Sequence, residues 1–486
     1  MKTQFILTGK MLIIAVVISL LTASALMAQE KMPITTSSEE ARELFIEGRD
    51  QFEKFNLTKS SNLLHQAIEV DPEFAMAHLY LSASEGGVSS FALKTLNKAI
   101  KFSSKVSEGE RQLIHLSRAM QSGNKTAGES HTKALLKLHP EDERIQLWIG
   151  YYHFNQGKYM DALSHFKRAE KLNKAFHPVY NVSGYAYMIL KKPVKAEQYF
   201  RKYLEILPDA ANSHDSYAEF LRKQGRFDEA IEHYKKAITY SPGFLASHKG
   251  LADSYLFKGE YGLAREQYRN YYKHGSNRNL QFNSLLWEAT VDLHEKNPES
   301  ALKIMDRYID LAEERKLPYY KVYGRAYKAG ILNENGETEK ALKLYRKAIK
   351  VAETEDMDEE IRMNLKSLAH LWEFYGLASN GNMDEAELAR TQCNEMLALR
   401  ENPYHRQVYY GACGIMEIKK GNYRQARKNL SKGYEGPFTW YYRGLAWEKS
   451  GNNKKAREWY EKVTKDYNNS MELGVFRNKA MAGLRK

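Results

Sequence analysis

The sequence predicts an all-α protein built as an array of helical hairpins. A pattern of small and aromatic residues recurs every 34 residues over the first half of the chain. Within each repeat, apolar residues lie three and four positions apart, as in helices with one buried face. The 486 residues include only 11 prolines and no alternating β-branched runs, which disfavours an all-β fold.

Composition excludes several classes of protein. The mean hydropathy of −0.62 argues against a multi-span membrane protein, and the 33 tyrosines and 19 phenylalanines are too many large side chains for a disordered chain. The net charge of +13 raises nucleic acid as a partner. The charge is spread over both halves and no nucleic-acid-binding motif stands out, so we predict a solvated repeat surface and no nucleic-acid partner.

The first 28 residues have the layout of a secretory signal peptide. Lys2 and Lys10 precede the apolar run 11–21, and small residues follow as far as Ala28. Cleavage is predicted after Ala28, with Ala25 as a second position. An exported protein, periplasmic or secreted, is therefore expected.

An uncleaved anchor helix is the alternative for this segment. Residues 11–28 are 18 uncharged residues, the lower bound for crossing a bilayer. With cleavage we expect no stable membrane span, and residues 29–40 form a linker. Ser37 and Glu40 stand at capping-box spacing before the first predicted helix.

The regular repeats cover residues 41–278. Their seven starts are Ala41, Ala75, Gly109, Glu143, His177, Ala211 and Leu245. The clearest repeat, 211–244, carries its marks at positions 8, 15, 20, 24, 27 and 32, which are Ala218, Gly225, Ala230, Tyr234, Ala237 and Pro242. Glycine suits the turn between the two helices because it adopts positive φ without strain.

This pattern resembles the tetratricopeptide repeat, and the resemblance implies a right-handed α-α superhelical solenoid. Five irregular repeats follow over 279–467, with position 20 on Ala301, Ala341, Ala386, Ala426 and Ala456. Residues 468–486 are predicted to form a capping helix over the last repeat. The prediction is thus about twelve hairpins and one cap. Tyr234, Tyr268, Tyr345 and Tyr460, all at position 24, are expected to pack between helices.

No catalytic motif stands out, so we predict a protein that is not an enzyme and needs no cofactor or metal. His214 and His248 occupy repeat position 4, where a packing role is expected. Cys393 and Cys413 fall at small packing positions of consecutive repeats. An exported chain with two cysteines allows one disulfide, and two buried thiols are the alternative.

The resemblance also places a ligand groove on the first helix of each repeat. Polar, charged and tyrosine side chains gather there in repeats four to seven, where core packing does not call for them. These predicted groove residues are Arg144, Tyr151, Asn181, Tyr185, Asn212, Asp215, Glu219, Arg222, Lys249 and Asp253. A merely solvated face is the alternative.

The function predicted from these features is a non-catalytic scaffold of the cell envelope that binds a peptide or protein segment in the groove. The alternative is a binding protein for a small ligand or glycan, recognised by groove tyrosines. The sequence leaves the partner and the oligomeric state open.

Overall fold

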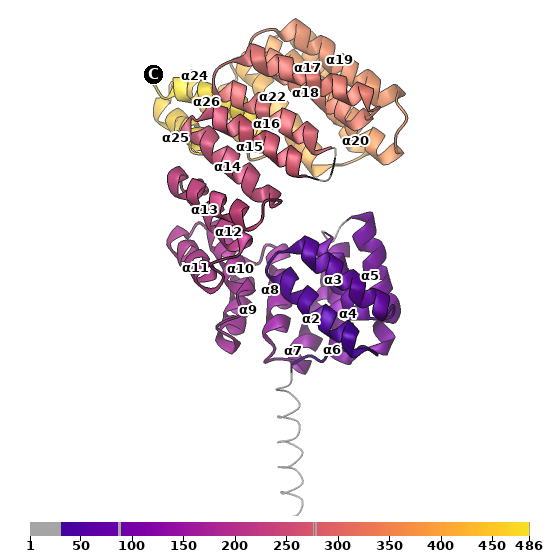
Figure 1. Cartoon of the computed structure of the whole chain (residues 1–486). Coiled ribbons are helices and arrows are strands. Elements are labelled where there is room, and N and C mark those ends of the chain that lie inside the picture. Colours follow the sequence, from indigo (N-terminus) through magenta and orange to yellow (C-terminus); the bar gives the residue numbers. More distant parts are fainter. Residues whose placement is uncertain (1–30, 86–88, 276, 278, 486) are drawn as a thin grey trace, which may run out of the picture. The chain divides into compact units, whose positions relative to one another are not determined.

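The computed structural model describes residues 31–85, 89–275, 277 and 279–485. In this part of the chain the regular structure consists of 25 α-helices and one short 3-10 helix, without a strand (Figure 1). The prediction of an all-α fold is confirmed. The predicted signal peptide lies outside the described residues.

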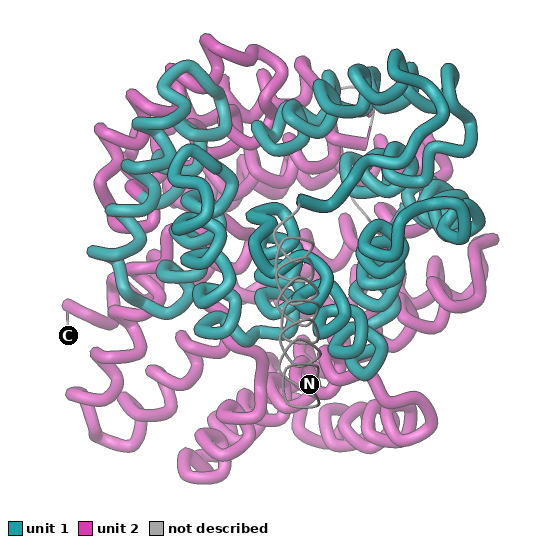
Figure 2. The backbone as a smooth tube through the Cα atoms, turned by 90° about the horizontal axis from the view of Figure 1, so that it is seen from below, with its two compact units in different colours: residues 1–220 teal, residues 221–486 magenta. Residues whose placement is uncertain are grey.

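The chain divides into two compact units, residues 1–220 and 221–486 (Figure 2). The division falls within α12 (Ala211–Lys223). The helices before it are α2 (Glu39–Glu53), α3 (Leu57–Val70), α4 (Ala75–Ser84), α5 (Ser90–Phe102), α6 (Glu108–Ser122), α7 (Lys125–Leu138), α8 (Glu143–Asn155), α9 (Tyr159–Leu172), α10 (Pro178–Ile189) and α11 (Pro193–Ile206).

The helices of the second unit continue the same alternation. They are α13 (Phe227–Tyr240), α14 (Leu245–Lys258), α15 (Tyr261–His274), α16 (Leu280–His294), α17 (Pro298–Glu314), α18 (Pro318–Glu334), α19 (Thr338–Thr354), α20 (Glu359–Asn380), α21 (Met383–Leu399), α22 (Pro403–Lys419), α23 (Tyr423–Leu430), α24 (Pro437–Lys449), α25 (Asn453–Thr464) and α26 (Met471–Gly483). In sequence order the described helices make twelve consecutive pairs followed by α26.

Each unit is built from antiparallel pairs in which a helix packs on the next one along the chain. α2 packs on α3, α8 on α9 and α18 on α19. The chain reverses at a glycine with positive φ in eight of the described turns between first and second helices: Gly123, Gly157, Gly225, Gly259, Gly336, Gly381, Gly421 and Gly451. This conformation is strained for other residues, which explains the glycine marks at position 15.

Small residues and aromatic rings fill the space between helices. The rings of Tyr234, Tyr268, Tyr345 and Tyr460 are at most 2% exposed, so their predicted packing role is confirmed. Gly150 in α8 lies against the ring of Phe166 in α9, and a Cβ atom there would sit 2.2 Å from the ring. The close approach of these two helices therefore requires glycine.

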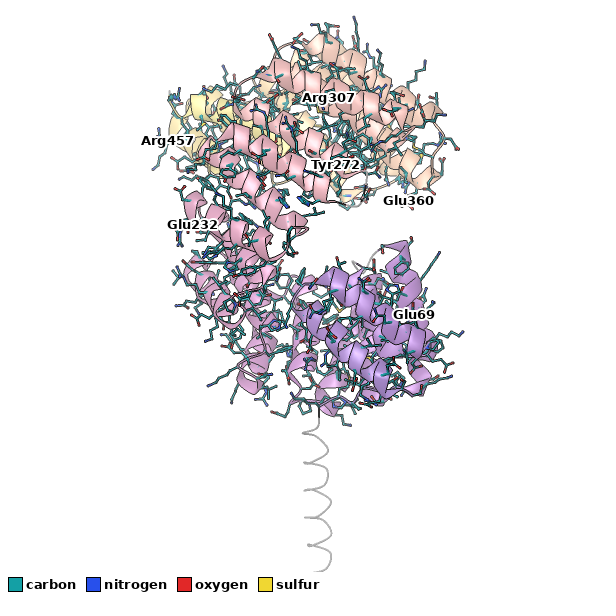
Figure 3. The ribbon with its side chains drawn as sticks, in the orientation of Figure 1. Glu69, Glu232, Tyr272, Arg307, Glu360 and Arg457 are labelled. Atoms are coloured by element: carbon teal, nitrogen blue, oxygen red, sulfur yellow. The ribbon has the colours of Figure 1, made fainter. Side chains whose placement is uncertain are left out.

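Charged side chains cover the second helix of many pairs. Glu69 of α3, Glu232 of α13 and Arg307 of α17 are exposed, and Figure 3 shows them on the outside of the ribbon. This agrees with the expectation of a solvated repeat surface.

Polar side chains also fix the ends of helices. The N-cap of α2 is Ser38, whose hydroxyl accepts from Ala41 N, so the predicted pairing of Ser37 with Glu40 was one residue out of register. A reciprocal capping box forms instead at Ser107 and Glu110 of α6.

The histidines at repeat position 4 have a shared structural role. The ring nitrogen Nε2 of His214 lies 2.8 Å from Pro208 O, and that of His248 lies 2.9 Å from Pro242 O. Each histidine therefore holds the proline turn that precedes its own helix. His78 makes the same contact to Pro72 O at 3.0 Å.

The last helix does more than cover the last hairpin. α26 packs on α25, as a capping helix should, but it also packs on α16, α18 and α24 (Figure 1). Residues 466–470, which join α25 to α26, are not helical. The C-terminal segment thus returns to helices that precede it by almost 200 residues.

Candidate functional site

The predicted groove residues all lie on the first helix of a pair, and in each unit we call the surface lined by its first helices the first-helix face of that unit. Arg144 and Tyr151 are in α8, and Asn181 and Tyr185 are in α10. The others lie in α12 and α14: Asn212, Asp215, Glu219, Arg222, Lys249 and Asp253. Arg222, Lys249 and Asp253 belong to the second unit and the rest to the first.

Arg144 is held by an ion pair within the first unit. Its Nε atom donates to Glu53 Oε1 at 2.7 Å, and its Nη2 atom donates to Glu53 Oε2 at 3.1 Å. The side chain of Glu53 is 7% exposed and that of Arg144 is 25% exposed. Burial raises the pKa of Glu53, although the nearby guanidinium opposes the shift. This ion pair joins α2 of the first hairpin to α8 of the fourth hairpin.

Aromatic rings surround this ion pair. Trp148 Nε1 donates to Tyr80 Oη at 3.4 Å, which links α8 to α4. Tyr151 stands edge-on to both Trp148 and Phe166. Arg144 and Tyr151 therefore stabilise the first unit as well as lining its first-helix face.

The predicted residues of α10 and α12 in the first unit are bonded or buried. Tyr185 Oη donates to Glu219 Oε2 at 2.8 Å, and Asn212 Nδ2 donates to Tyr203 Oη at 2.8 Å. Burial and the Glu219 carboxylate raise the pKa of Tyr185 well above its usual value. Asn181 and Asp215 are 8% exposed.

In the second unit, Asp253 is the centre of a buried polar network. Its carboxylate is fully buried and accepts from Lys249 Nζ and from Tyr268 Oη, both at 2.7 Å. Arg222 Nη1 lies 3.5 Å from Asp253 Oδ2. Burial, followed by the Asp253 charge, raises the pKa of Tyr268 well above its usual value, so its hydroxyl stays a donor.

The same network binds the chain's own C-terminal segment. Arg222 Nη1 donates to the backbone carbonyl of Tyr467. Asn469 Nδ2 donates to Tyr268 Oη at 2.7 Å and to Thr290 Oγ1 at 3.0 Å. The Tyr467 ring stands edge-on to Phe227 and Phe257, at centroid distances of 5.0 and 5.4 Å. We call residues 466–470 the return segment.

α26 continues along the first-helix face beyond the return segment. Asn478 Nδ2 donates to Leu293 O of α16 at 2.9 Å. Lys479 Nζ donates to the backbone carbonyl of Glu334 in α18 at 2.7 Å and also bonds its carboxylate. Hydrogen bonds and an ion pair therefore anchor this helix on α16 and α18.

These contacts correct one expectation about the groove. Its polar residues were expected to have no part in packing, whereas Arg222 and Asp253 are buried and bonded. The residues that sequence reasoning missed are Tyr467, Asn469 and Lys479. Their partners lie 145 to 245 positions away, and no repeat spacing signals such a contact.

A cavity of about 220 Å³ opens on the first-helix face of the first unit. Its lining is mostly apolar and comes from α4, α5, α6 and α8: Leu79, Ser82, Ala83, Leu96, Ser117, Met120, Gln121, Trp148 and Asn155. The Ser117 hydroxyl is buried and has no hydrogen-bond partner among the described residues. An unpaired buried hydroxyl is costly, so a ligand that bonds it gains binding energy.

The two cysteines are buried free thiols in the structure. Burial raises the pKa of Cys393 to about 12 and that of Cys413 to about 11, which keeps both protonated at neutral pH. A disulfide between them stays a prediction for the oxidised protein. Among the described residues, no group of three or more metal-ligating side chains comes together.

Comparisons with known proteins agree with the repeat pattern. Models described as tetratricopeptide repeat match residues 116–178, 149–211 and 221–271. The human protein O-mannosyl-transferase TMTC2 is 36% identical over 97 residues, which are 19% of this chain and 12% of the human protein. Anaphase-promoting complex subunit 6 of Arabidopsis thaliana is 28% identical over 148 residues, 29% of this chain and 27% of that protein.

Solved structures that are similar share at most 20% identity with this chain. PilW, described as a type IV pilus biogenesis factor, is 19% identical, and the match covers 42% of this chain and 92% of PilW with a TM-score of 0.37. For the two curated relatives, human TMTC2 and anaphase-promoting complex subunit 6, the alignments cover about an eighth and about a quarter of their own lengths. The matched residues 116–211 lie in the first unit and 221–271 in the second, so the chain carries tetratricopeptide repeats in both of its units.

Proposed function

We propose that this protein is a non-catalytic scaffold of the cell envelope that binds an extended peptide or protein segment on its first-helix face. The return segment is the observation that carries the proposal. It is a non-helical stretch of polypeptide held on that face of the second unit by hydrogen bonds and an aromatic contact.

The contacts of the return segment combine two kinds of recognition. Arg222 binds a backbone carbonyl, which every peptide offers, and so holds the segment without reading its sequence. The aromatic contact of Tyr467 and the amide of Asn469 depend on the side chain and so provide specificity. This division is usual in peptide recognition.

For a partner supplied from outside, we assign the cavity of the first unit. Its apolar lining suits an aliphatic or aromatic side chain, and Trp148 and Met120 provide contact area at its wall. Ser117, Gln121 and Asn155 offer polar atoms to the adjoining backbone. A polypeptide with one apolar anchor beside a polar stretch fits this lining.

A filled cavity tests the proposal directly. Ala83 lines the cavity, so Ala83→Phe places a ring inside it, and we expect captured partner from envelope extract to fall by about tenfold. Ala398→Phe is the matched control, because Ala398 is exposed on α21. Both variants should keep the helicity of the parent chain. Undiminished capture by folded Ala83→Phe would refute the assignment of this cavity.

The envelope location rests on the sequence of residues 1–28. No helix in the described ranges is both long and apolar enough to cross a membrane. We expect amino-terminal sequencing of the mature protein to begin at Gln29. Protein recovered from the membrane with Met1 retained would instead support the uncleaved anchor.

A further inference from the structure

A second cavity, lined by aromatic rings, lies within the second unit. Its volume is about 150 Å³, a size that admits a molecule such as benzene. α26 forms one wall, and the first helices α18, α20, α22 and α24, the second helix α19 and the segment before α24 contribute the others. The aromatic lining consists of Tyr327, Tyr345, Trp372, Tyr375, Tyr404, Tyr434, Phe438 and Phe476.

The rings are held in place by contacts with one another. The ring of Phe438 stacks on Tyr434 at 6.0 Å and stands edge-on to Tyr375 at 5.4 Å and to Phe476 at 5.7 Å. Aromatic faces carry negative electrostatic potential. A cavity with this lining attracts a cation whose own surface is apolar.

Two carboxylates border the cavity, and only one of them is neutralised by the protein. Glu334 is paired with Lys479 and accepts from the hydroxyls of Tyr375 and Tyr442. Glu472 accepts from Tyr434 Oη at 2.6 Å, and among the described residues it forms no ion pair with a lysine, arginine or histidine. Burial raises the pKa of Glu472, as expected for a carboxyl without a cation beside it.

We propose that this cavity binds a trimethylammonium group, with the aromatic rings around its methyl groups and Glu472 as its counter-charge. A primary ammonium would need several hydrogen-bond acceptors to replace its water, whereas a methylated one exposes apolar surface to the rings. A sugar fits less well, because the hydroxyls of Tyr375 and Tyr434 are already bonded to Glu334 and Glu472. This ligand is independent of the peptide proposed for the first unit.

Choline and its uncharged carbon analogue, 3,3-dimethylbutan-1-ol, test the charge requirement at constant shape. We expect calorimetry with the full mature chain to show choline binding at least about tenfold tighter than the analogue. Equal affinity for both compounds would overturn the proposal, since the cavity would then recognise shape alone. Absence of choline binding would overturn it as well.

Variants test the two parts of the cavity separately. Glu472→Gln keeps an oxygen for Tyr434 Oη, removes the charge, and should abolish the preference for choline over the analogue. Trp372→Leu removes one ring and should weaken choline binding. Glu232→Gln is the matched control, since Glu232 is exposed on α13 and away from the cavity lining. An unchanged preference in folded Glu472→Gln would refute the role of the carboxylate.

The trimethylammonium group occurs in free cations and in lipid headgroups, and a further arm separates these sources. Cosedimentation with phosphatidylcholine vesicles, with and without competing choline, reports a headgroup. Vesicle binding that choline displaces supports a lipid source, and choline binding without vesicle binding supports a free cation.

Discussion

At the scale of single residues, Arg144 is a predicted ligand-binding residue that also stabilises the first unit through its ion pair with Glu53. Arg144→Met leaves the buried Glu53 carboxylate without its main partner, and we expect the free energy of unfolding at pH 7 to fall by about 2–4 kcal/mol. Burial already raises the pKa of Glu53, and loss of the guanidinium raises it further. The protonated form of Glu53 is then favoured in the folded variant. The difference in unfolding free energy between the parent and Arg144→Met should therefore shrink as the pH falls towards about 4.

Urea unfolding of the parent and the variant at pH 7 and pH 4 measures this difference. Adding Glu53→Gln to Arg144→Met should recover part of the lost stability, because no buried charge remains. Equal deficits at the two pH values would mean that Arg144 stabilises the first unit by packing alone.

His294 in α16 is expected to make the second unit less stable at acid pH. Burial, with a smaller effect of Arg477, lowers its pKa to about 3. Below its unfolded pKa of about 6.5 the unfolded chain takes up a proton that the folded chain refuses, so stability falls as the pH falls. In His294→Phe the loss of unfolding free energy between pH 7 and pH 4.5 should be smaller by about 2 kcal/mol.

His65→Phe provides the control for this titration, because His65 is exposed. Denaturant unfolding at the two pH values is the measurement. The assignment of the acid response to His294 fails if both variants follow the parent profile.

At the scale of elements, neighbouring asparagines of the return segment form a matched pair for mutation. Asn469 bonds Tyr268 and Thr290, whereas Asn468, within the part of the chain that the structure describes, bonds Asp466 beside it and no other residue. Asn469→Ala should lower the unfolding free energy by about 1–2 kcal/mol and speed amide exchange in α15 and α16, which carry its two partners. Asn468→Ala should stay within about 0.5 kcal/mol of the parent. Similar exchange in both variants would show that the return segment does not anchor these helices.

Elements were predictable from sequence where one repeat contains all the information. The buried Tyr234 and the positive φ of Gly225 follow from spacing, since their partners lie in the same or the next hairpin. The N-cap of α2 was misplaced by one residue because Ser37 and Ser38 are both good caps. Spacing alone does not tell which of two adjacent serines faces the helix.

The candidate site was predictable only in part. The pattern placed Arg222 and Asp253 on the first-helix face, but their exposure was misjudged because Tyr467 and Asn469 lie in the C-terminal segment, which was expected to cover only the last repeat. The aromatic cavity was not anticipated either. Glu472 lies in the segment 468–486 that was predicted to cap the last repeat, and only the packing of α26 against α18 and α24 brings it among rings from five other helices.

At the scale of the whole molecule, the two units are expected to unfold separately. Each has its own buried hydrophobic clusters, and repeat arrays often depart from two-state behaviour. Five of the six tryptophans lie in residues 221–486, and Trp148 alone lies in the first unit. Tryptophan fluorescence should therefore report mainly the second unit, while circular dichroism reports both.

The measurement is a urea titration followed by both signals. We expect the two curves to have different midpoints, and Arg144→Met to shift the circular dichroism curve more than the fluorescence curve. Coincident curves in the parent and in the variant would indicate a single cooperative transition.

The contact between Arg222 and Tyr467 has a consequence for how the protein is made. The ribosome completes α14 more than 200 residues before it reaches Tyr467, and α15 follows directly, so Asp253 and Tyr268 emerge with part of their network still unsynthesised. Most repeat arrays add each hairpin to a finished neighbour, whereas this unit closes only when its last residues arrive. A nascent chain stalled before residue 466 would present an incomplete first-helix face, open to chaperones and proteases until translation ends.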